Sequence, residues 1–126
     1  MKALSLTQPW ASLIADGRKR IETRSWPTSF RGRIAIHAAK SIDKEACAEF
    51  GYRPEDLPRG AIIGTIELYG CVRFPSPLAP PDEYGDFYEG RYGFLLKDFC
   101  EAPKPIPTRG ALGLWEWNCE GDEERT

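Results

Sequence analysis

The sequence predicts an α+β domain in which a small β-barrel of about five or six strands is flanked by short helices. Two short helical patterns lie in the first half of the chain, and the longest apolar runs typical of strands come after them. With 126 residues, of which 41% are hydrophobic, the chain can close one core but not two. We therefore expect one domain over residues 1–119, followed by an acidic tail over residues 120–126.

The chain begins with a predicted strand and a short helix. Polar and apolar residues alternate over residues 2–6, which indicates a strand. Proline is tolerated in the first turn of a helix, so Pro9 marks a helix start, and Gly17 is placed to end that helix. The spacing gives the helix one apolar face, formed by Trp10, Leu13 and Ile14.

Residues 18–24 alternate again and predict a second strand. A regular strand would place Glu22 and Arg24 on one face and Lys19 on the other. A bulge or turn near Gly17 would instead bring the three side chains together, and the sequence leaves both arrangements open.

The middle of the chain contains a strand, a helix and a long strand. Residues 33–38 are mostly apolar and follow a turn, which predicts a strand. Residues 41–50 predict a helix that is capped by Ser41 and ends at Gly51. The clearest strand covers residues 61–74, and its length predicts a bend or bulge at one of its glycines, Gly64 or Gly70.

The last third begins with a loop over residues 75–90, whose length in a small domain suggests a functional role. Three of its carboxylates are candidates to reach a binding site, namely Glu83, Asp86 and Glu89. A strand over residues 92–99, a proline-rich turn and a strand over residues 112–117 complete the expected fold.

The charge pattern is uneven along the chain. The net charge of −2 argues against a protein that binds nucleic acid through bulk positive charge. Residues 1–40, however, contain eight Lys and Arg residues against two acidic ones. Either one positive face is aimed at an anion, or these charges are scattered around the fold.

Several classes of function are disfavoured. No apolar run approaches the ~20 residues that span a bilayer, so we expect a cytoplasmic protein without membrane contact. The four cysteines form no CxxC pair, and His37 is the single histidine, so we expect reduced thiols, no metal and no cofactor. The chain has no phosphate-binding glycine loop and no nucleophile elbow, and His37 on an apolar strand is interpreted as structural.

The densest group of chemically active residues lies at 17–26. Lysine, glutamate and arginine side chains follow one another there, close to Trp10 and Trp26. Cations, a carboxylate and flat aromatic faces suit a nucleotide. The alternative is an exposed, ion-paired strand with its tryptophans in the core.

Three motifs make the chain resemble the ASCH domain, a family of the PUA-like superfamily. They are LSLTQPWASLI at residues 4–14, G-x-K-x-x-E-x-R at 17–24 and RGRIAIHA at 31–38. GAIIGTI at 60–66 and GLWEW at 113–117 extend the similarity over nearly the whole chain. The resemblance implies a small barrel with a cleft, RNA binding, and a role in RNA metabolism or coactivation. It also implies which residues line the cleft: Gln8, Trp10, Lys19, Glu22 and Arg24.

One bacterial branch of that family removes the acetyl group from N4-acetylcytidine. In that branch a lysine at the place of Lys19 is catalytic, together with a threonine three residues later and a glutamate from a later loop. This sequence departs from the pattern, because the third residue after Lys19 is Glu22, and Thr23 lies one place further along. A one-residue step along a strand turns a side chain to the other face.

The leading hypothesis is a domain that binds RNA or a nucleotide in a basic, aromatic-lined cleft beside the barrel. In this hypothesis the phosphate is contacted by Lys19 and Arg24, with Arg18 or Arg20. The base stacks on Trp10 or Trp26. Its polar edge is recognised by Gln8 and Glu22. A second hypothesis is a hydrolase acting on a modified pyrimidine nucleoside such as N4-acetylcytidine, or on RNA as a ribonuclease. There, Lys19 and Glu22 would be the catalytic pair. A third is a protein-interaction module whose partners the sequence does not identify.

Overall fold

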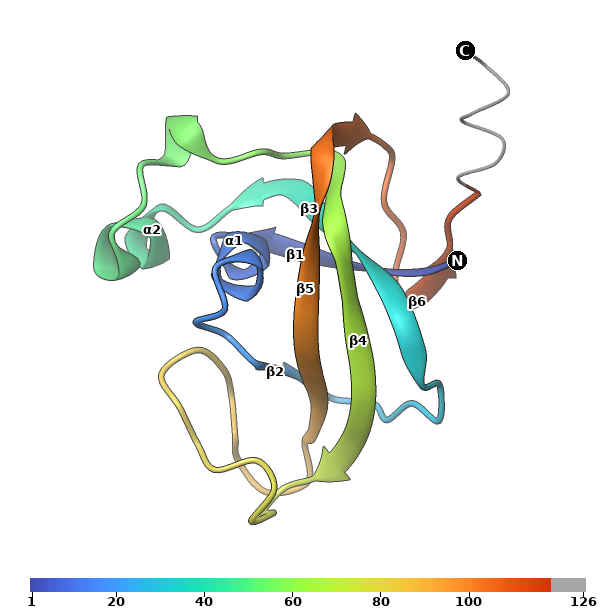
Figure 1. The fold of residues 1–126 in the computed structure, drawn as a ribbon. Coiled ribbons are helices and arrows are strands. Elements are labelled where there is room, and N and C mark those ends of the chain that lie inside the picture. Colours follow the sequence, from blue (N-terminus) through green and yellow to red (C-terminus); the bar gives the residue numbers. More distant parts are fainter. Residues whose placement is uncertain (119–126) are drawn as a thin grey trace.

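The structure of the protein is a computed structural model that describes residues 1–118. Cys119 and the predicted acidic tail over 120–126 lie outside the described residues. The strands and helices follow one another as β1 (Lys2–Gln8), α1 (Trp10–Ala15), β2 (Ile21–Arg24), β3 (Gly32–Ile42), α2 (Lys44–Phe50), a 3-10 turn (Pro54–Asp56), β4 (Ala61–Arg73), β5 (Tyr92–Pro107) and β6 (Leu114–Glu116) (Figure 1).

The described strands form one curled, mixed sheet in the order β2-β5-β4-β3-β1-β6. β1 and β3 pair in parallel, and the other neighbours pair antiparallel. The predicted α+β class and the barrel-like shape are confirmed, but the sheet does not close, because β2 and β1 share no ladder. The domain is thus a small barrel with an open seam between these two strands.

The main core lies inside the curl of the sheet, under α1. Leu4, Ile36, Leu68 and Phe94 are fully buried there, and Ile14 of α1 packs against the same cluster. The apolar face predicted for α1 is therefore largely confirmed, although Trp10 is only partly buried and Ala11 is buried beside Leu13. Burial of these side chains holds α1 at one end of the seam.

A side chain links the two strands that border the seam. β6 pairs with β1 only over Lys2–Leu4, so it leaves the outer edge of β1 beyond Leu4 uncovered. Arg24, the last residue of β2, donates from Nη2 to the carbonyl oxygen of Ser5 at 3.0 Å. The guanidinium thus makes a link that backbone hydrogen bonds would make in a closed barrel.

The second helix is shorter than predicted, and its cap is a different residue. Asp43 caps α2 by accepting a hydrogen bond from the Ala46 amide at 3.0 Å, whereas Ser41 lies in β3. The Ser41 hydroxyl lies 2.7 Å from that of Thr7. Aspartate and serine are both good caps, and the length of β3 decides between them. Gly51 ends α2 in the left-handed conformation, as predicted.

The predicted proline-rich turn between two late strands is wrong. β5 runs without interruption to Pro107, with Ile106 opposite Ile62 of β4. Pro103 and Pro105 lie between Glu101 and Ile106, where the ladder shifts register and four residues of β5 face one residue of β4, so no regular pair needs their amide donors. The bends predicted in β4 are confirmed, since the ladder between β4 and β5 shifts register before both Gly64 and Gly70.

Candidate functional site

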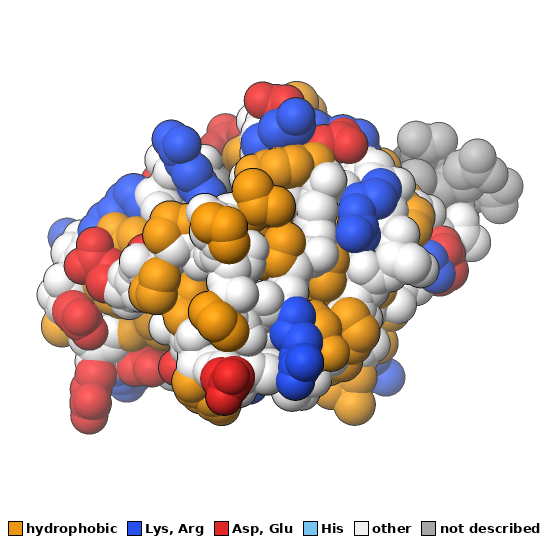
Figure 2. Space-filling model, turned by 90° about the horizontal axis from the view of Figure 1, so that it is seen from below, with side chains coloured by type: hydrophobic (Ala, Val, Ile, Leu, Met, Phe, Trp, Pro, Cys, Tyr) orange, Lys and Arg blue, Asp and Glu red, His pale blue; other side chains and the backbone are white. Residues whose placement is uncertain are grey.

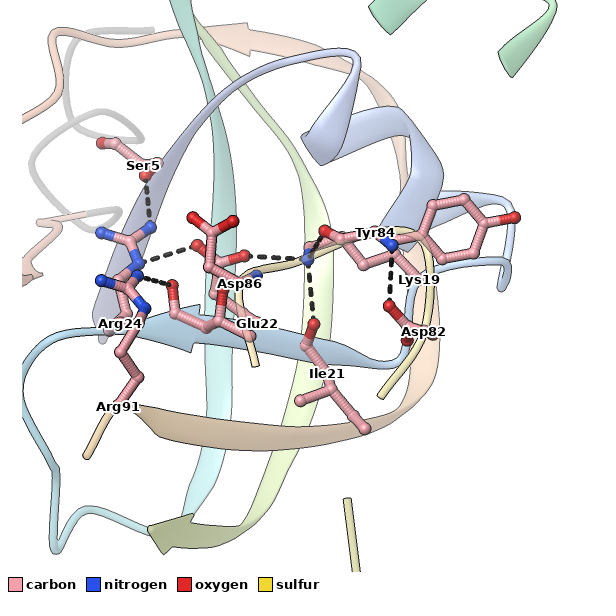
Figure 3. Close-up of polar contacts among 10 residues, drawn as sticks. Ser5, Lys19, Ile21, Glu22, Arg24, Asp82, Tyr84, Asp86 and Arg91 are labelled. Atoms are coloured by element: carbon pink, nitrogen blue, oxygen red, sulfur yellow. Dashed lines mark hydrogen bonds and ion pairs between the residues drawn. The ribbon is translucent and has the colours of Figure 1, made fainter. Parts of the chain in front are cut away.

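A polar cleft of about 530 Å³ opens at the seam between β1 and β2. Its walls are β1, the first turn of α1, β2 and the loop over residues 75–90. Figure 3 shows the residues at its base, where Glu22 and Arg24 of β2 lie in a row with Lys19, which precedes this strand. The structure thus brings together four of the predicted site residues, Trp10, Lys19, Glu22 and Arg24, as lining of one cleft.

Lys19 enters the cleft because the chain turns before the second strand begins. The amides of Arg18 and Lys19 both donate to the carbonyl oxygen of Leu13 at 3.0 Å, and β2 starts only at Ile21. Of the two arrangements that the sequence allowed, the turn near Gly17 is therefore the correct one. It places Lys19 on the same side as Glu22 and Arg24.

The Lys19 ammonium is buried and fully coordinated. Its side chain is 2% exposed, and Nζ donates to the carbonyl oxygens of Tyr84 at 2.6 Å and Ile21 at 2.9 Å. Nζ also lies 3.3 Å from Oε1 of Glu22. Three acceptors match the three N–H donors of the ammonium group, so these contacts occupy all of its hydrogen-bonding capacity.

Glu22 lies between two cations. Its Oε1 faces Lys19, and its Oε2 accepts from Nε of Arg24 at 2.7 Å. The carboxylate is 11% exposed, so the two cations compensate the loss of water around it. The row Lys19–Glu22–Arg24, which we call the buried triad, forms the floor of the cleft.

The 75–90 loop is fastened over the cleft at two places. The ring of Tyr84 packs against Phe50 of α2 with centroids 5.1 Å apart, beside the hydrogen bond from Lys19. Further along, the amide of Asp86 donates to Oγ1 of Thr23 at 3.1 Å. Gly85 allows this approach, because a Cβ there would lie 2.8 Å from Cγ2 of Thr23.

Two of the three candidate loop carboxylates reach the cleft. Glu83 and Asp86 are part of its lining, and Glu89 is not among the described residues that line it. Arg91, at the end of the loop, also lines the cleft. Position in the sequence alone could not distinguish these three carboxylates, because the distinction depends on where the loop is fastened.

The cleft is mixed in charge, whereas the sequence predicted a basic one. Its lining contains three cations, and it also contains four carboxylates, Glu22, Asp43, Glu83 and Asp86. The basic residues of the first third of the chain point to different surfaces: Arg31 donates to the Thr28 carbonyl and Arg33 to Thr65 of β4. Figure 2 likewise shows Lys and Arg side chains scattered among apolar groups on the face seen from below.

Gln8 is a structural residue of the domain and does not line the cleft. Its side chain is fully buried, and Oε1 accepts from the amide of Ser12 at 3.0 Å. Nε2 donates to the carbonyl oxygen of Pro58 at 2.8 Å. The amide therefore fastens the first turn of α1 to the connector that precedes β4.

We predict that Gln8→Met lowers the free energy of unfolding by about 1–3 kcal/mol, because the Ser12 amide and the Pro58 carbonyl lose their partner. Chemical denaturation measures this change. Ligand affinity of the folded variant should equal that of the wild type. A variant of unchanged stability that no longer binds ligand would show instead that Gln8 contacts it.

Arg18, Arg20 and Trp26 also lie outside the cleft lining. Arg18 donates to the Phe50 carbonyl at 2.9 Å and lies over the Tyr52 ring, and Arg20 donates to the Gly17 carbonyl. Burial and the hydrogen bond to Asp16 raise the pKa of Tyr52 to about 12. Trp26 packs edge-on against Phe94, with centroids 5.2 Å apart, and so belongs to the core.

His37 has the contacts of a structural residue. Nε2 lies 2.7 Å from the carbonyl oxygen of Thr108, which can only accept, so Nε2 carries the proton. Nδ1 then accepts from the Ser5 hydroxyl at 2.9 Å, and the Trp115 indole donates to that hydroxyl. A larger, more apolar cavity of about 780 Å³ borders this network, and Ser5 lines both cavities.

The cysteines and the acidic side chains add no further centre among the residues described. Cys47, Cys71 and Cys100 are free thiols, and burial raises the pKa of the Cys47 thiol. Within residues 1–118, no group of three or more His, Cys, Asp or Glu side chains is arranged to hold a metal ion. In the same part of the chain, no helix combines the length and apolar character that crossing a membrane would require.

Fold and site together define a small α+β domain with a barrel-like sheet and a polar, ligand-sized cleft at its open seam. The model of the ASCH domain family matches residues 4–93, and the chain belongs to that family. The ASCH domain is a PUA-like domain associated with RNA binding.

Comparisons with individual proteins agree with this assignment. Activating signal cointegrator 1 from Homo sapiens is 31% identical over 125 residues, and the Mus musculus protein is 30% identical. The match covers 90% of this chain but only 22% of those relatives. The crystal structure of ASCH from Zymomonas mobilis shares the fold with a TM-score of 0.61 at 22% identity, over 98% of this chain and 92% of that one. A single-residue variant of that protein gives the same TM-score.

Proposed function

We propose that this domain binds RNA by taking one unpaired base into the seam cleft. The observation that carries the proposal is the Glu22 carboxylate, held between Lys19 and Arg24 on the floor of the cleft. A carboxylate fixed in this way accepts hydrogen bonds from the amino group of a base, as carboxylates do from the N4 amino group of cytosine.

The size and lining of the cleft support a base as the ligand. About 530 Å³ lies within the ~300–1,000 Å³ range of small-ligand pockets. Trp10 offers part of its ring to the cleft, and aromatic faces stack on the unstacked bases of single-stranded RNA. The polar floor and the aromatic wall meet at Lys19, whose Nζ lies 5.9 Å from the centre of the Trp10 ring.

The contacts of Lys19 support binding more than hydrolysis. A catalytic lysine needs its Nζ free to approach the reacting group of the substrate. Here the ammonium has three acceptors around it, and one of them is the Glu22 carboxylate. Thr23 is occupied as well, since its Oγ1 accepts from the amide of Asp86.

We predict that Trp10→Leu weakens binding of a labelled single-stranded RNA about fivefold or more, because stacking of one base contributes about 1–3 kcal/mol. Fluorescence anisotropy at fixed salt measures the affinity. Tyr69→Leu is the matched control, since Tyr69 is a half-exposed aromatic residue of β4 outside the cleft lining. Equal affinities for the wild type and both variants, with all three proteins folded, would contradict base binding in the cleft.

Further assays distinguish the other two functions. Release of acetate from N4-acetylcytidine, or cleavage of the RNA, by the wild type but not by Lys19→Met would establish a hydrolase. Capture of a protein partner that depends on the 75–90 loop, without any RNA binding, would establish an interaction module. Retention of intact RNA in a complex that weakens with rising salt is the result we expect.

A further inference from the structure

Arg91 reaches the cleft from the end of the 75–90 loop and joins Arg24 at one end of it. Arg24 pairs in the ladder with Tyr92, the residue after Arg91. Nη2 of Arg91 donates to the carbonyl oxygen of Thr23, the residue before Arg24. In Figure 3 the two guanidinium groups point to the same end of the cleft, beside Glu22.

The guanidinium group of Arg91 has only weak hydrogen bonds within the protein. Its two hydrogen bonds are long, at 3.3 Å to the Thr23 carbonyl and 3.4 Å to the Tyr88 hydroxyl. Its Nε is buried and has no hydrogen-bond partner among the described residues. Within that part of the chain no carboxylate lies within 4.0 Å of its guanidinium, whereas Arg24 meets Glu22 at 2.7 Å.

The charges at this end of the cleft are unbalanced. Arg24 and Arg91 supply two cations, and the Glu22 carboxylate beside them is already shared between Arg24 and Lys19. Glu83 and Asp86 also line the cleft, but neither forms an ion pair with Arg91. The Arg91 guanidinium lines the cleft without a carboxylate partner among the described residues, and an anion bound at this end would supply one.

We infer that Arg24 and Arg91 bind the phosphate of the nucleotide whose base occupies the cleft. This inference rests on the proposed function and specifies its ligand as a nucleotide, in preference to a free nucleoside. Planar guanidinium groups suit phosphate oxygens, which accept paired N–H bonds. Arg91 was not among the residues that the sequence pattern singled out as phosphate ligands, because it lies outside the G-x-K-x-x-E-x-R motif.

The test is calorimetric titration with the four nucleosides and their 5′- and 3′-monophosphates. We expect at least one monophosphate to bind the wild type about tenfold or more tightly than its nucleoside, since charged hydrogen bonds contribute about 1.5–3 kcal/mol. Arg91→Gln should remove this advantage and leave nucleoside affinity unchanged. Arg73→Gln, which removes an exposed cation of β4 outside the cleft, should retain it. The preferred position of the phosphate then tells on which side of the base the RNA backbone lies.

Equal affinity of the wild type for nucleoside and monophosphates would overturn the inference while leaving base binding intact. The inference would also be overturned if Arg91→Gln still bound the monophosphate more tightly than the nucleoside. Binding of neither ligand would reject the proposed function as well. Should Arg91→Gln not fold, the Nε–H resonance of Arg91 in the wild type replaces it: a monophosphate should shift this signal, and its nucleoside should not. If the Nε–H resonance shifts with neither the monophosphate nor the nucleoside, although the base still binds, the inference is also overturned.

Discussion

Glu22→Gln should lower the free energy of unfolding by about 3–5 kcal/mol, which is the range for breaking a buried ion pair by removing one partner. The substitution keeps the shape of the side chain and removes its charge. Lys19, which is 2% exposed, and Arg24 would then face each other across a neutral amide. A buried ammonium and a partly exposed guanidinium without a counter-charge are the source of the expected loss.

Chemical denaturation of Glu22→Gln beside Glu101→Gln tests this expectation. Glu101 is an exposed carboxylate of β5 without an ion pair among the described residues, and its neutralisation should change stability by no more than about 0.5 kcal/mol. If the two variants differ from the wild type by similar amounts, Glu22 does not compensate the cations of the buried triad.

Lys19→Met should release the 75–90 loop from the body of the domain. The ammonium donates to the Tyr84 carbonyl at 2.6 Å, and methionine fills similar space but has no donor. We expect a loss of about 1.5–3 kcal/mol in stability, together with faster amide exchange over residues 83–87. The reduced protection should be confined to this loop and its contacts, because Glu22 retains Arg24 as a partner.

Hydrogen exchange followed by mass spectrometry measures the release of the loop. Lys97→Met is the matched control, since Lys97 is an exposed lysine of β5 that lies over the Tyr69 ring. Loop exchange that is unchanged in Lys19→Met would show that Tyr84 and Asp86 hold the loop without Lys19. Weaker RNA binding together with faster loop exchange would identify Lys19 as a positioning residue for the cleft.

Much of the fold could be predicted from local patterns. Alternation and glycine placement indicated β1, the long strand β4 and the end of α2, because these features depend on a few neighbouring residues. The prolines near the end of β5 misled the same reasoning. A proline breaks a strand only where its amide would be paired, and Pro103 and Pro105 fall in an irregular stretch of the ladder between β4 and β5.

The site was only partly predictable for a related reason. Spacing placed Lys19, Glu22 and Arg24 near one another, but whether they meet depends on the two hydrogen bonds to the Leu13 carbonyl. Gln8 resembled a recognition residue in the sequence, whereas its surroundings make it a structural one. Asp86 and Arg91 line the cleft because contacts with Thr23, which is distant in the sequence, fix their positions. A local sequence pattern does not encode such contacts.

The Arg24 link between β2 and β1 has a mechanical consequence. In a barrel closed by backbone ladders, the circumference is set by strand number and shear, and no single side chain can alter it. Here the flexible side chain of Arg24 spans the seam to the carbonyl oxygen of Ser5, so the width of the seam depends on this hydrogen bond. A ligand that drew Arg24 away from Ser5 would remove this link, and ligand binding would then be thermodynamically coupled to the width of the seam.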